Sequence, residues 1–162
     1  MEQGTNMERA YQVYFKIVDH LNKLNWKFDR HDDELLITTG IKSEDLPISF
    51  LLMVKAKNEV IQFLSQLPFK APEDKRIDFA IAVNVANYGL VDGSFDYDLG
   101  DGEIRYRLTC SYRGNTVEGN LIDYIIAVAS ATVDNYNDKF LMLSDGTIDI
   151  EQFIKKEEYV DE

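Results

Sequence analysis

Apolar residues recur every three or four positions in the first part of the chain, as they do along one face of a helix. The stripe consists of Ala10, Val13, Tyr14, Ile17, Val18, Leu21 and Leu24. Thr5 or Asn6 can cap its first turn, because their side-chain oxygens accept a hydrogen bond from a free backbone N–H. The pattern therefore predicts a helix that runs from this cap to about Asn25.

The next segments have the shorter pattern of strands. Residues 26–28 and 35–40 are rich in apolar and β-branched side chains and flank the polar stretch 29–33, so we predict a hairpin. Pro47 then opens a strand over 48–54 that carries apolar residues on both faces. We expect both faces to be covered, the second by a helix or by another copy of the chain.

Two structures fit residues 59–66, which follow a tight turn at Lys57-Asn58. The apolar residues of this segment also match a helical face, but the segment is short and β-branched near its start, so we predict a fourth strand. The stretch from Pro68 to Pro72 ends this part of the sheet.

A second helix is predicted to begin at Pro72, because a proline at the first helical position followed by two acidic residues is typical of a helix start. Its expected inner stripe consists of Ile77, Ala80, Ile81, Asn84, Val85 and Tyr88. Asn84 is the unusual member, and we expect a buried amide that bonds to backbone rather than to a ligand. Gly89 is the expected end of the helix.

A second hairpin follows, with strands over 94–98 and 103–112 joined by a glycine-containing turn. The second strand alternates strictly between apolar and polar residues, as a half-buried strand does. The register of this hairpin sets Asp96 opposite Arg105, which predicts a cross-strand ion pair.

The last part of the chain is predicted to be helical from about 116 to 143. The apolar stripe of this long helix consists of Ile122, Ile125, Ile126, Ala129, Val133, Tyr136 and Phe140. Asp149 and Gln152 have the spacing of a capping box and open a short helix over 149–156. The acidic tail 157–162 is expected to fray into solvent.

The predicted order is therefore α-β-β-β-β-α-β-β-α-α, which indicates an α+β fold with an antiparallel sheet and flanking helices. No internal repeat and no Pro/Gly/Ser-rich linker divides the 162 residues. We expect a single domain over 1–162 with a core of about 5–145.

Composition narrows the classes of function. The chain has 17 basic and 29 acidic residues and a formal net charge of −12, which disfavours nucleic acid and anionic membranes because their phosphates are repelled. The N-terminal residues lack the basic-then-apolar pattern of a secretory signal, and no apolar run approaches the roughly 20 residues that cross a bilayer. We therefore expect a cytoplasmic protein that binds neither nucleic acid nor membrane.

Two acidic stretches invite comparison with metal sites. Residues 29–34 contain one imidazole and four carboxylates, which suit a divalent cation, but consecutive residues cannot all converge on one ion and also favour a solvated turn. The acidic residues from Asp92 to Glu103 resemble a calcium loop, yet Tyr97 stands at the sixth position, where that loop requires glycine. We predict no metal site.

One basic stripe stands out in this acidic chain. Arg105, Arg107 and Arg113 alternate with apolar residues along a single predicted strand. With Asp96 and Asp98 beside them, they are our candidate residues for binding a ligand or partner, and ion pairs that only stabilise the fold are the alternative.

No pattern indicates catalysis. Cys110 is the only cysteine and lies on the apolar face of its strand, where burial disfavours the reactive thiolate. His20 and His31 belong to no catalytic signature, and the chain has no GxSxG, HExxH, Walker A or GxGxxG motif. We expect no cofactor and no enzymatic activity.

The second half of the chain resembles the YbjN-like family of bacterial sensory-transduction regulators. The resemblance is carried by 87–98, by 102–107 and by a long helix that contains 134–136 and ends at Leu141. It implies the α+β fold shared with type III secretion chaperones, regulatory or chaperone-like protein binding, and frequent dimerisation. It carries over no catalytic residue, and the short helix at 149–156 is an addition to it.

Three functional hypotheses follow from this reading. The first is a non-enzymatic module that forms a homodimer and binds a basic or amphipathic segment of a partner protein, strand addition at a sheet edge being one route. The second is a sensor of a small molecule or ion with a pocket lined by Asp92, Asp96, Asp98 and Arg107. The third is a hydrolase that uses two carboxylates as acid and base, which needs both in one cleft.

Overall fold

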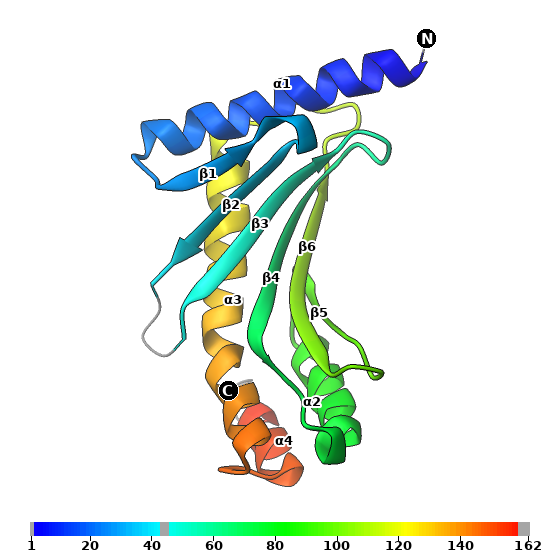
Figure 1. The fold of residues 1–162 in the computed structure, drawn as a ribbon, viewed down its shortest axis with the longest axis vertical. Helices are drawn as coiled ribbons and strands as arrows, with labels where there is room; N and C mark the ends of the chain where they lie inside the picture. The colour runs from blue at the N-terminus through cyan, green and yellow to red at the C-terminus, as the bar shows by residue number, and fades with distance from the viewer. Residues whose placement is uncertain (1, 43–45, 159–162) are drawn as a thin grey trace.

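The computed structural model describes residues 2–42 and 46–158, in which a six-stranded antiparallel sheet packs against helices on one of its faces (Figure 1). The strands lie in the order β1-β2-β3-β4-β6-β5. The element order and the α+β class confirm the prediction from the sequence. The elements are α1 (Glu2–Lys23), β1 (Phe28–His31), η1 (Asp32–Glu34), β2 (Leu36–Ile41), β3 (Ile48–Lys55), β4 (Val60–Lys70), η2 (Glu73–Lys75), α2 (Arg76–Tyr88), β5 (Ser94–Tyr97), β6 (Glu103–Ser111), α3 (Gly119–Asp145) and α4 (Ile150–Glu158).

Helix α1 crosses one end of the sheet and buries most of the predicted apolar stripe (Figure 1). It begins at Glu2, so the prediction of a cap at Thr5 or Asn6 is wrong, and both residues lie inside the helix. Neither residue breaks a helix, since each costs under about 1 kcal/mol relative to alanine. Leu24 was expected to complete the stripe, but it is exposed because the helix ends at Lys23.

The first hairpin is confirmed, although its first strand lies further along the chain than predicted. β1 occupies 28–31 instead of 26–28, and β2 pairs with it in an antiparallel register. The reversal is made by η1 and by Leu35, whose left-handed φ of 51° turns the chain back. The local pattern marked the polar stretch as the turn, but its first residues form regular pairs with β2.

Residues 59–66 are a strand, as predicted, and the strand is longer than its pattern indicated. β4 continues to Lys70 and passes through Pro68. Proline is tolerated there because the register of β4 against β6 shifts between Gln66 and Lys70, so the position donates no ladder hydrogen bond.

The orientation of α2 differs from the prediction. Its buried residues are Phe79, Ala82, Val83 and Ala86. Ile77, Ile81 and Tyr88 are instead 65%, 43% and 92% exposed, and Asn84 is exposed as well. The expected inner stripe and the expected buried amide at Asn84 are therefore wrong. The helix has an apolar stripe on each side, so spacing alone could not decide which one faces the core.

The amide of α2 that bonds to backbone is the partly buried Asn87, in the last turn of the helix. Its Nδ2 donates to the carbonyl of Phe95 at 3.0 Å, and its Oδ1 accepts from the Phe95 N–H at 2.7 Å. Phe95 lies in β5, the outermost strand on that side of the sheet. The second hairpin has the predicted register, with Asp96 opposite Arg105.

Helix α3 packs behind the sheet and buries the whole of its predicted stripe. It ends at Asp145 and is followed by Gly146, whose φ of 84° is the left-handed conformation that glycine adopts without strain. The capping box is confirmed, because the Asp149 N–H donates to Gln152 Oε1 at 2.9 Å and the Gln152 N–H donates to Asp149 Oδ1 at 2.8 Å. Among the described residues, no helix combines the length and apolarity needed to cross a bilayer.

The C-terminal segment is more ordered than a fraying tail. α4 continues to Glu158, and Phe153 is fully buried and stacks on Phe140 of α3 at 5.5 Å. The side chain of Glu157 is only 11% exposed, so the prediction of a solvated tail is wrong for that residue. Residues 159–162 of the predicted tail lie outside the described residues.

Candidate functional site

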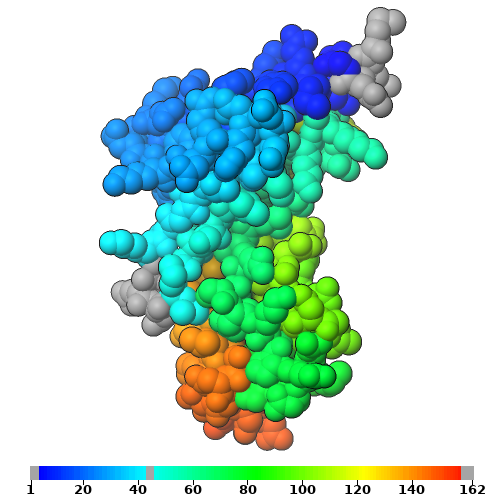
Figure 2. Space-filling model, viewed as in Figure 1, coloured from blue at the N-terminus to red at the C-terminus, as the bar shows by residue number. Residues whose placement is uncertain are grey.

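Within residues 2–42 and 46–158, no element covers the face of the sheet opposite the helices. On β3 the side chains alternate between the buried Ile48, Phe50, Leu52 and Val54 and an outer row of Ser49, Leu51, Met53 and Lys55. Leu51 in this row is 39% exposed. Figure 2 shows the cyan and green strands open to view with no helix over them. Of the two covers expected for the second face of this strand, a helix is not found among the described residues, and another copy of the chain stays a prediction.

A groove of about 720 Å³ lies on this outer face. The residues that line it are Lys27, Phe28, Asp29, Thr38, Thr39, Gly40, Ser49, Phe50, Leu51, Leu64 and Gln66. Ser49 and Gln66 also line a second depression of about 350 Å³, which continues toward Pro68 and Lys70. Apart from Lys27 and Asp29, the residues that line the groove of about 720 Å³ are uncharged.

One row of outer side chains crosses the whole sheet. In register order it consists of Asp29, Thr38, Leu51, Leu64, Arg107 and Ser94. Because neighbouring strands lie about 4.8 Å apart, the row is roughly 24 Å long. It therefore presents a carboxylate at the β1 edge, two leucines at its centre and a guanidinium beyond them.

Arg105 and Arg107, two of the predicted ligand residues, both bind Asp96. Arg107 donates through Nε and Nη2 to the two carboxylate oxygens, each at 2.8 Å, and Arg105 donates through Nε at 3.2 Å. The hydrogen bond from Arg107 is the main cause that lowers the pKa of the Asp96 carboxyl. The predicted Asp96–Arg105 pair is confirmed, with Arg107 as the closer partner.

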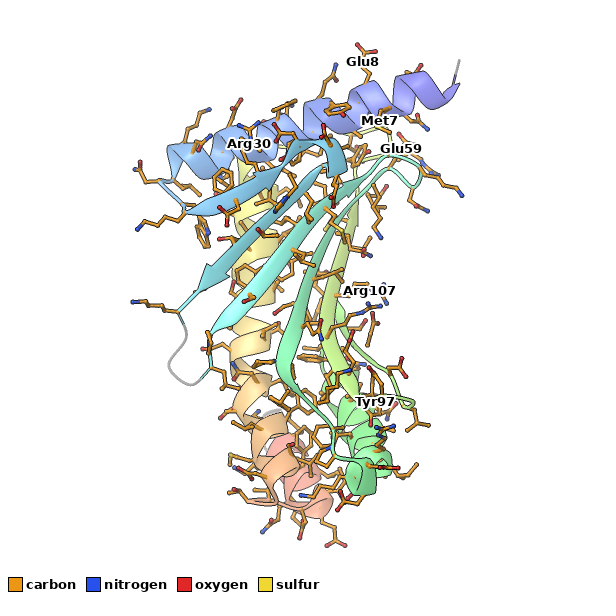
Figure 3. All side chains as sticks on the ribbon, viewed as in Figure 1. Met7, Glu8, Arg30, Glu59, Tyr97 and Arg107 are labelled. Atoms are coloured by element: carbon orange, nitrogen blue, oxygen red, sulfur yellow. The ribbon has the colours of Figure 1, made fainter. Side chains whose placement is uncertain are left out.

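Arg113 belongs to a separate cluster near α1. Its Nε donates to Glu59 Oε2 at 3.0 Å, and Arg9 donates to Glu59 Oε1 at 3.0 Å. The Glu59 side chain is 12% exposed and lies at the β3–β4 turn, below the first half of α1 (Figure 3). The sequence reasoning missed Glu59, because its partners are 50 and 54 positions away and no local spacing marks it.

Of the four residues proposed for a sensor pocket, Asp96 and Asp98 line one depression of which Asp92 and Arg107 are not lining residues. A depression of about 320 Å³ is lined by Asp96, Tyr97, Asp98, Leu99, Glu103 and Arg105. Asp98 caps the turn by accepting from the Gly100 N–H at 2.7 Å, and Asp92 accepts from the hydroxyl of Tyr124. In the parts of the chain that the structure describes, no group of three His, Cys, Asp or Glu side chains is placed to hold a metal ion.

The polar turn after β1 is held by hydrogen bonds within the protein. Asp32 accepts from Arg30 at 2.7 and 3.0 Å and from the Tyr14 hydroxyl at 2.7 Å. The hydrogen bond from Arg30 lowers the pKa of Asp32, and burial, followed by the bond to Asp32, raises the pKa of Tyr14 to about 12. This carboxylate therefore already serves to join the turn to α1.

The sulfhydryl and the imidazoles lie apart. Cys110 is half-buried, and burial raises the pKa of its thiol. His20 lies 2.7 Å from Asp123, between α1 and α3, whereas His31 lies 3.4 Å from Thr38 on the hairpin. No nucleophile–base pair is formed by these three side chains.

One family model covers most of the chain. The YbjN model, with the description "Putative bacterial sensory transduction regulator", matches residues 16–142. The match takes in the whole sheet and most of α3 but stops before α4. No functionally curated protein matches the chain.

Three solved structures are similar in fold. YbjN from E. coli is 10% identical with a TM-score of 0.59, over 78% of this chain and 92% of that chain. A chain of the HopA1-SchA chaperone-effector complex is 12% identical with a TM-score of 0.56, over 82% and 97%. A chain of the ExsC-ExsE complex is 10% identical with a TM-score of 0.52, over 78% and 92%. At these identities the similarity shows the fold alone.

Proposed function

Because the chain belongs to the YbjN family, we propose that it is a regulatory or chaperone-like protein-binding module of a bacterial cytoplasm, without enzymatic activity of its own. The observation that carries this proposal is the uncovered face of the sheet with its groove of about 720 Å³. Similar folds occur in a chaperone-effector complex and in the ExsC-ExsE complex, which supports a role in binding another protein.

The chemistry of the groove favours an amphipathic segment. Leu51 and Leu64 are neighbours across β3 and β4 and give the row an apolar centre. Thr38, Ser49 and Gln66 surround this centre with hydroxyl and amide groups, which can hydrogen-bond a peptide. Apolar surface with a few convergent polar groups is the usual composition of a binding site.

The charge of the protein favours an amphipathic segment that is also basic. The net charge of −12 attracts a basic partner and speeds its encounter. At the β1 end of the row Asp29 can accept from a lysine or arginine of that partner. At the other end Arg107 remains 40% exposed although it binds Asp96, so its guanidinium can also donate to a partner carboxylate. The predicted arginine stripe therefore contributes to partner binding through Arg107.

A matched pair of variants tests the groove. Leu51→Glu places a charge at its apolar centre, and Leu99→Glu makes the same change at an exposed leucine outside it. Wild type and both variants serve as baits in a native lysate, with photo-cross-linking and quantitative mass spectrometry. We expect at least one protein that is retained by Leu99→Glu and lost with Leu51→Glu. Identical profiles for the three baits would refute the groove as the site.

A bait with Arg105→Glu and Arg107→Glu addresses the arginine stripe separately. If the arginines contribute to binding, this bait loses the same protein that Leu51→Glu loses. Unchanged capture would restrict Arg105, Arg107 and Asp96 to a stabilising role.

We further propose that the chain forms a homodimer, through the outer side of α2. Ile77, Ile81, Asn84 and Tyr88 are spaced by four, three and four residues, which is the spacing of a helix-pairing seam. A two-fold axis at its centre sets Ile77 against Tyr88 and Ile81 against Asn84 of the other copy. α2 contains one arginine and one aspartate, so the two helices approach without net charge.

Sedimentation equilibrium tests the dimer. We expect a dimer for the wild type at micromolar concentration and a monomer for Ile81→Glu. Leu24→Glu, at an exposed leucine beyond the end of α1, serves as the control and should remain dimeric. A monomeric wild type would contradict this proposal.

A further inference from the structure

The two edges of the sheet are not equivalent, because one of them is closed. β5 and β1 are its outermost strands. The Asp98 N–H donates to the carbonyl of Glu103 in β6. Because the backbone groups of successive strand residues point to opposite sides, those of Asp96 also face β6 and those of Phe95 point away from it. The Asn87 side chain binds both of them, at 2.7 and 3.0 Å. A strand could join β5 only by displacing this amide.

The edge of β1 is open. The N–H of Val54 in β3 donates to the carbonyl of Leu35. Because the backbone groups of successive strand residues point to opposite sides, those of Leu36 and Thr38 point toward β1. Their partners in β1, His31 and Asp29, therefore direct their own backbone groups toward β2. The N–H and C=O groups of Phe28 and Arg30 consequently point outward. Within residues 2–42 and 46–158 no strand lies beyond them. Such an edge is a template for another strand.

Helix α1 provides an apolar ledge beside this edge. Met7, Tyr11 and Phe15 are exposed and follow one another at intervals of four along α1. The rings of Tyr11 and Phe15 stack at 6.3 Å. The guanidinium of Arg30 lies 5.7 Å from the centre of the Phe15 ring, so the ledge meets β1 at this residue. Figure 3 shows Arg30 close beneath α1, with Met7 further along the same helix.

The charges around the edge favour a basic segment. The side chain of Asp29 lies on the outer face of β1, opposite Thr38, and Asp33 and Glu34 follow at the end of the strand. All three are exposed, and none of them forms an ion pair in the described part of the chain. Asp32, by contrast, is already paired with Arg30.

We propose that β1 binds an extended basic segment of the partner protein by strand addition, as a seventh strand of the sheet. Alternate side chains of this segment are apolar and pack on the ledge formed by Tyr11 and Phe15. The intervening side chains are lysine or arginine and reach Asp29 on the outer face. The inference rests on the proposed protein-binding function and specifies where the partner enters and which pattern its segment has.

A proline substitution isolates the backbone contribution. Arg30→Pro removes an outward N–H and places a proline on an edge strand, where it is compatible with the fold. Arg30→Ala removes the same side chain but keeps the N–H. The probe is a labelled peptide of about seven residues that alternates lysine and valine, with a block-sequence peptide of equal composition and a glutamate–valine peptide as controls.

Anisotropy and amide exchange read out the binding. We expect the alternating basic peptide to bind the wild type at least tenfold more tightly than either control peptide. Arg30→Pro should weaken the affinity for this peptide at least tenfold, because it removes an outward N–H. Arg30→Ala keeps that N–H and should weaken the affinity by no more than about threefold. The amides of Phe28 and Arg30 should become protected only when the peptide is added.

Each contrary result has a distinct meaning. No preference for the alternating basic peptide, or equal affinity of Arg30→Pro and Arg30→Ala, overturns strand addition at β1. If the peptide loses affinity with Leu51→Glu but not with Arg30→Pro, the groove binds partners without the edge, and the proposed function survives this failure. Protection of Phe28 and Arg30 in the free protein that rises with its concentration would assign the edge to a second copy of the chain.

Discussion

Replacement of Glu157 by glutamine is expected to destabilise the chain, because this carboxylate joins α4 to α3 in a poorly hydrated position. Glu157 accepts from Lys139 Nζ at 2.8 Å and from the Tyr136 hydroxyl at 2.7 Å. The side chains of Lys139 and Glu157 are 17% and 11% exposed. The Lys139 ammonium also lies 4.8 Å from the centre of the Tyr136 ring. Burial, reinforced by the bond to Glu157, raises the pKa of Tyr136 well above its ordinary value.

The expected loss in the free energy of unfolding depends on the unpaired charge that the substitution leaves behind. Removal of one partner from a buried ion pair costs about 3–5 kcal/mol, because the other charge is left unpaired. Since water reaches a small part of both side chains, we expect about 2–3 kcal/mol for Glu157→Gln and a similar loss for Lys139→Met. The double variant leaves no isolated charge, so its loss should be smaller than the sum by about 1–2 kcal/mol.

Urea unfolding followed by circular dichroism measures all three free energies of unfolding. Glu151→Gln, an exposed carboxylate on the same helix, is the control and should stay within about 0.5 kcal/mol of wild type. A loss for Glu157→Gln no larger than that of the control would refute the reasoning. A coupling free energy below about 0.5 kcal/mol would show that the two charges are not desolvated together.

The remaining predictions concern single side chains. The pKa of Asp96 is lowered in the folded state, so it stabilises the fold above its unfolded pKa of about 3.9. That contribution, under about 1 kcal/mol because the arginines are solvated, should disappear as pH falls through the lowered pKa, and urea midpoints at neutral and acidic pH should show no such loss in Asp96→Asn. Asn87→Ala should cost about 1–3 kcal/mol by leaving the backbone of Phe95 unpaired, whereas Asn135→Ala, at an exposed amide of α3, should stay within about 0.5 kcal/mol; equal thermal shifts would contradict this. Cys110 should react with iodoacetamide more slowly in the folded protein than in urea at neutral pH, because burial raises the pKa of its thiol. Equal rates in the two states would contradict this protection.

Local pattern was sufficient wherever one physical signal dominated. The stripe of α3 and the capping box of α4 were both identified, since a single apolar face or a three-residue spacing admits one structure. The β5–β6 register followed from the turn between its strands, and with it the pairing of Asp96 with Arg105. For the candidate site, the sequence therefore located Arg105 and Arg107 together with Asp96, the carboxylate that both of them bind.

Local pattern was not sufficient where two faces or two distant segments compete. α2 has an apolar stripe on each side, and the contact with β5 buries Phe79 and turns Asn87 toward β5, while Ile81 and Asn84 stay exposed. The partners of Glu59 come from α1 and from the end of β6, so no spacing announces that cluster.

The sequence by itself determined the α+β class, the order of the elements and the hydrophobic faces that are unambiguous, because helix and strand periodicity depend on neighbours within a few positions. Only the tertiary structure decided which face of the sheet remains open, which edge is closed by Asn87 and that Glu157 is held at Lys139. These features arise when segments far apart in the chain compete for the same buried surface and the same backbone hydrogen-bonding groups. That competition is resolved by packing of the whole chain, which a local pattern does not contain.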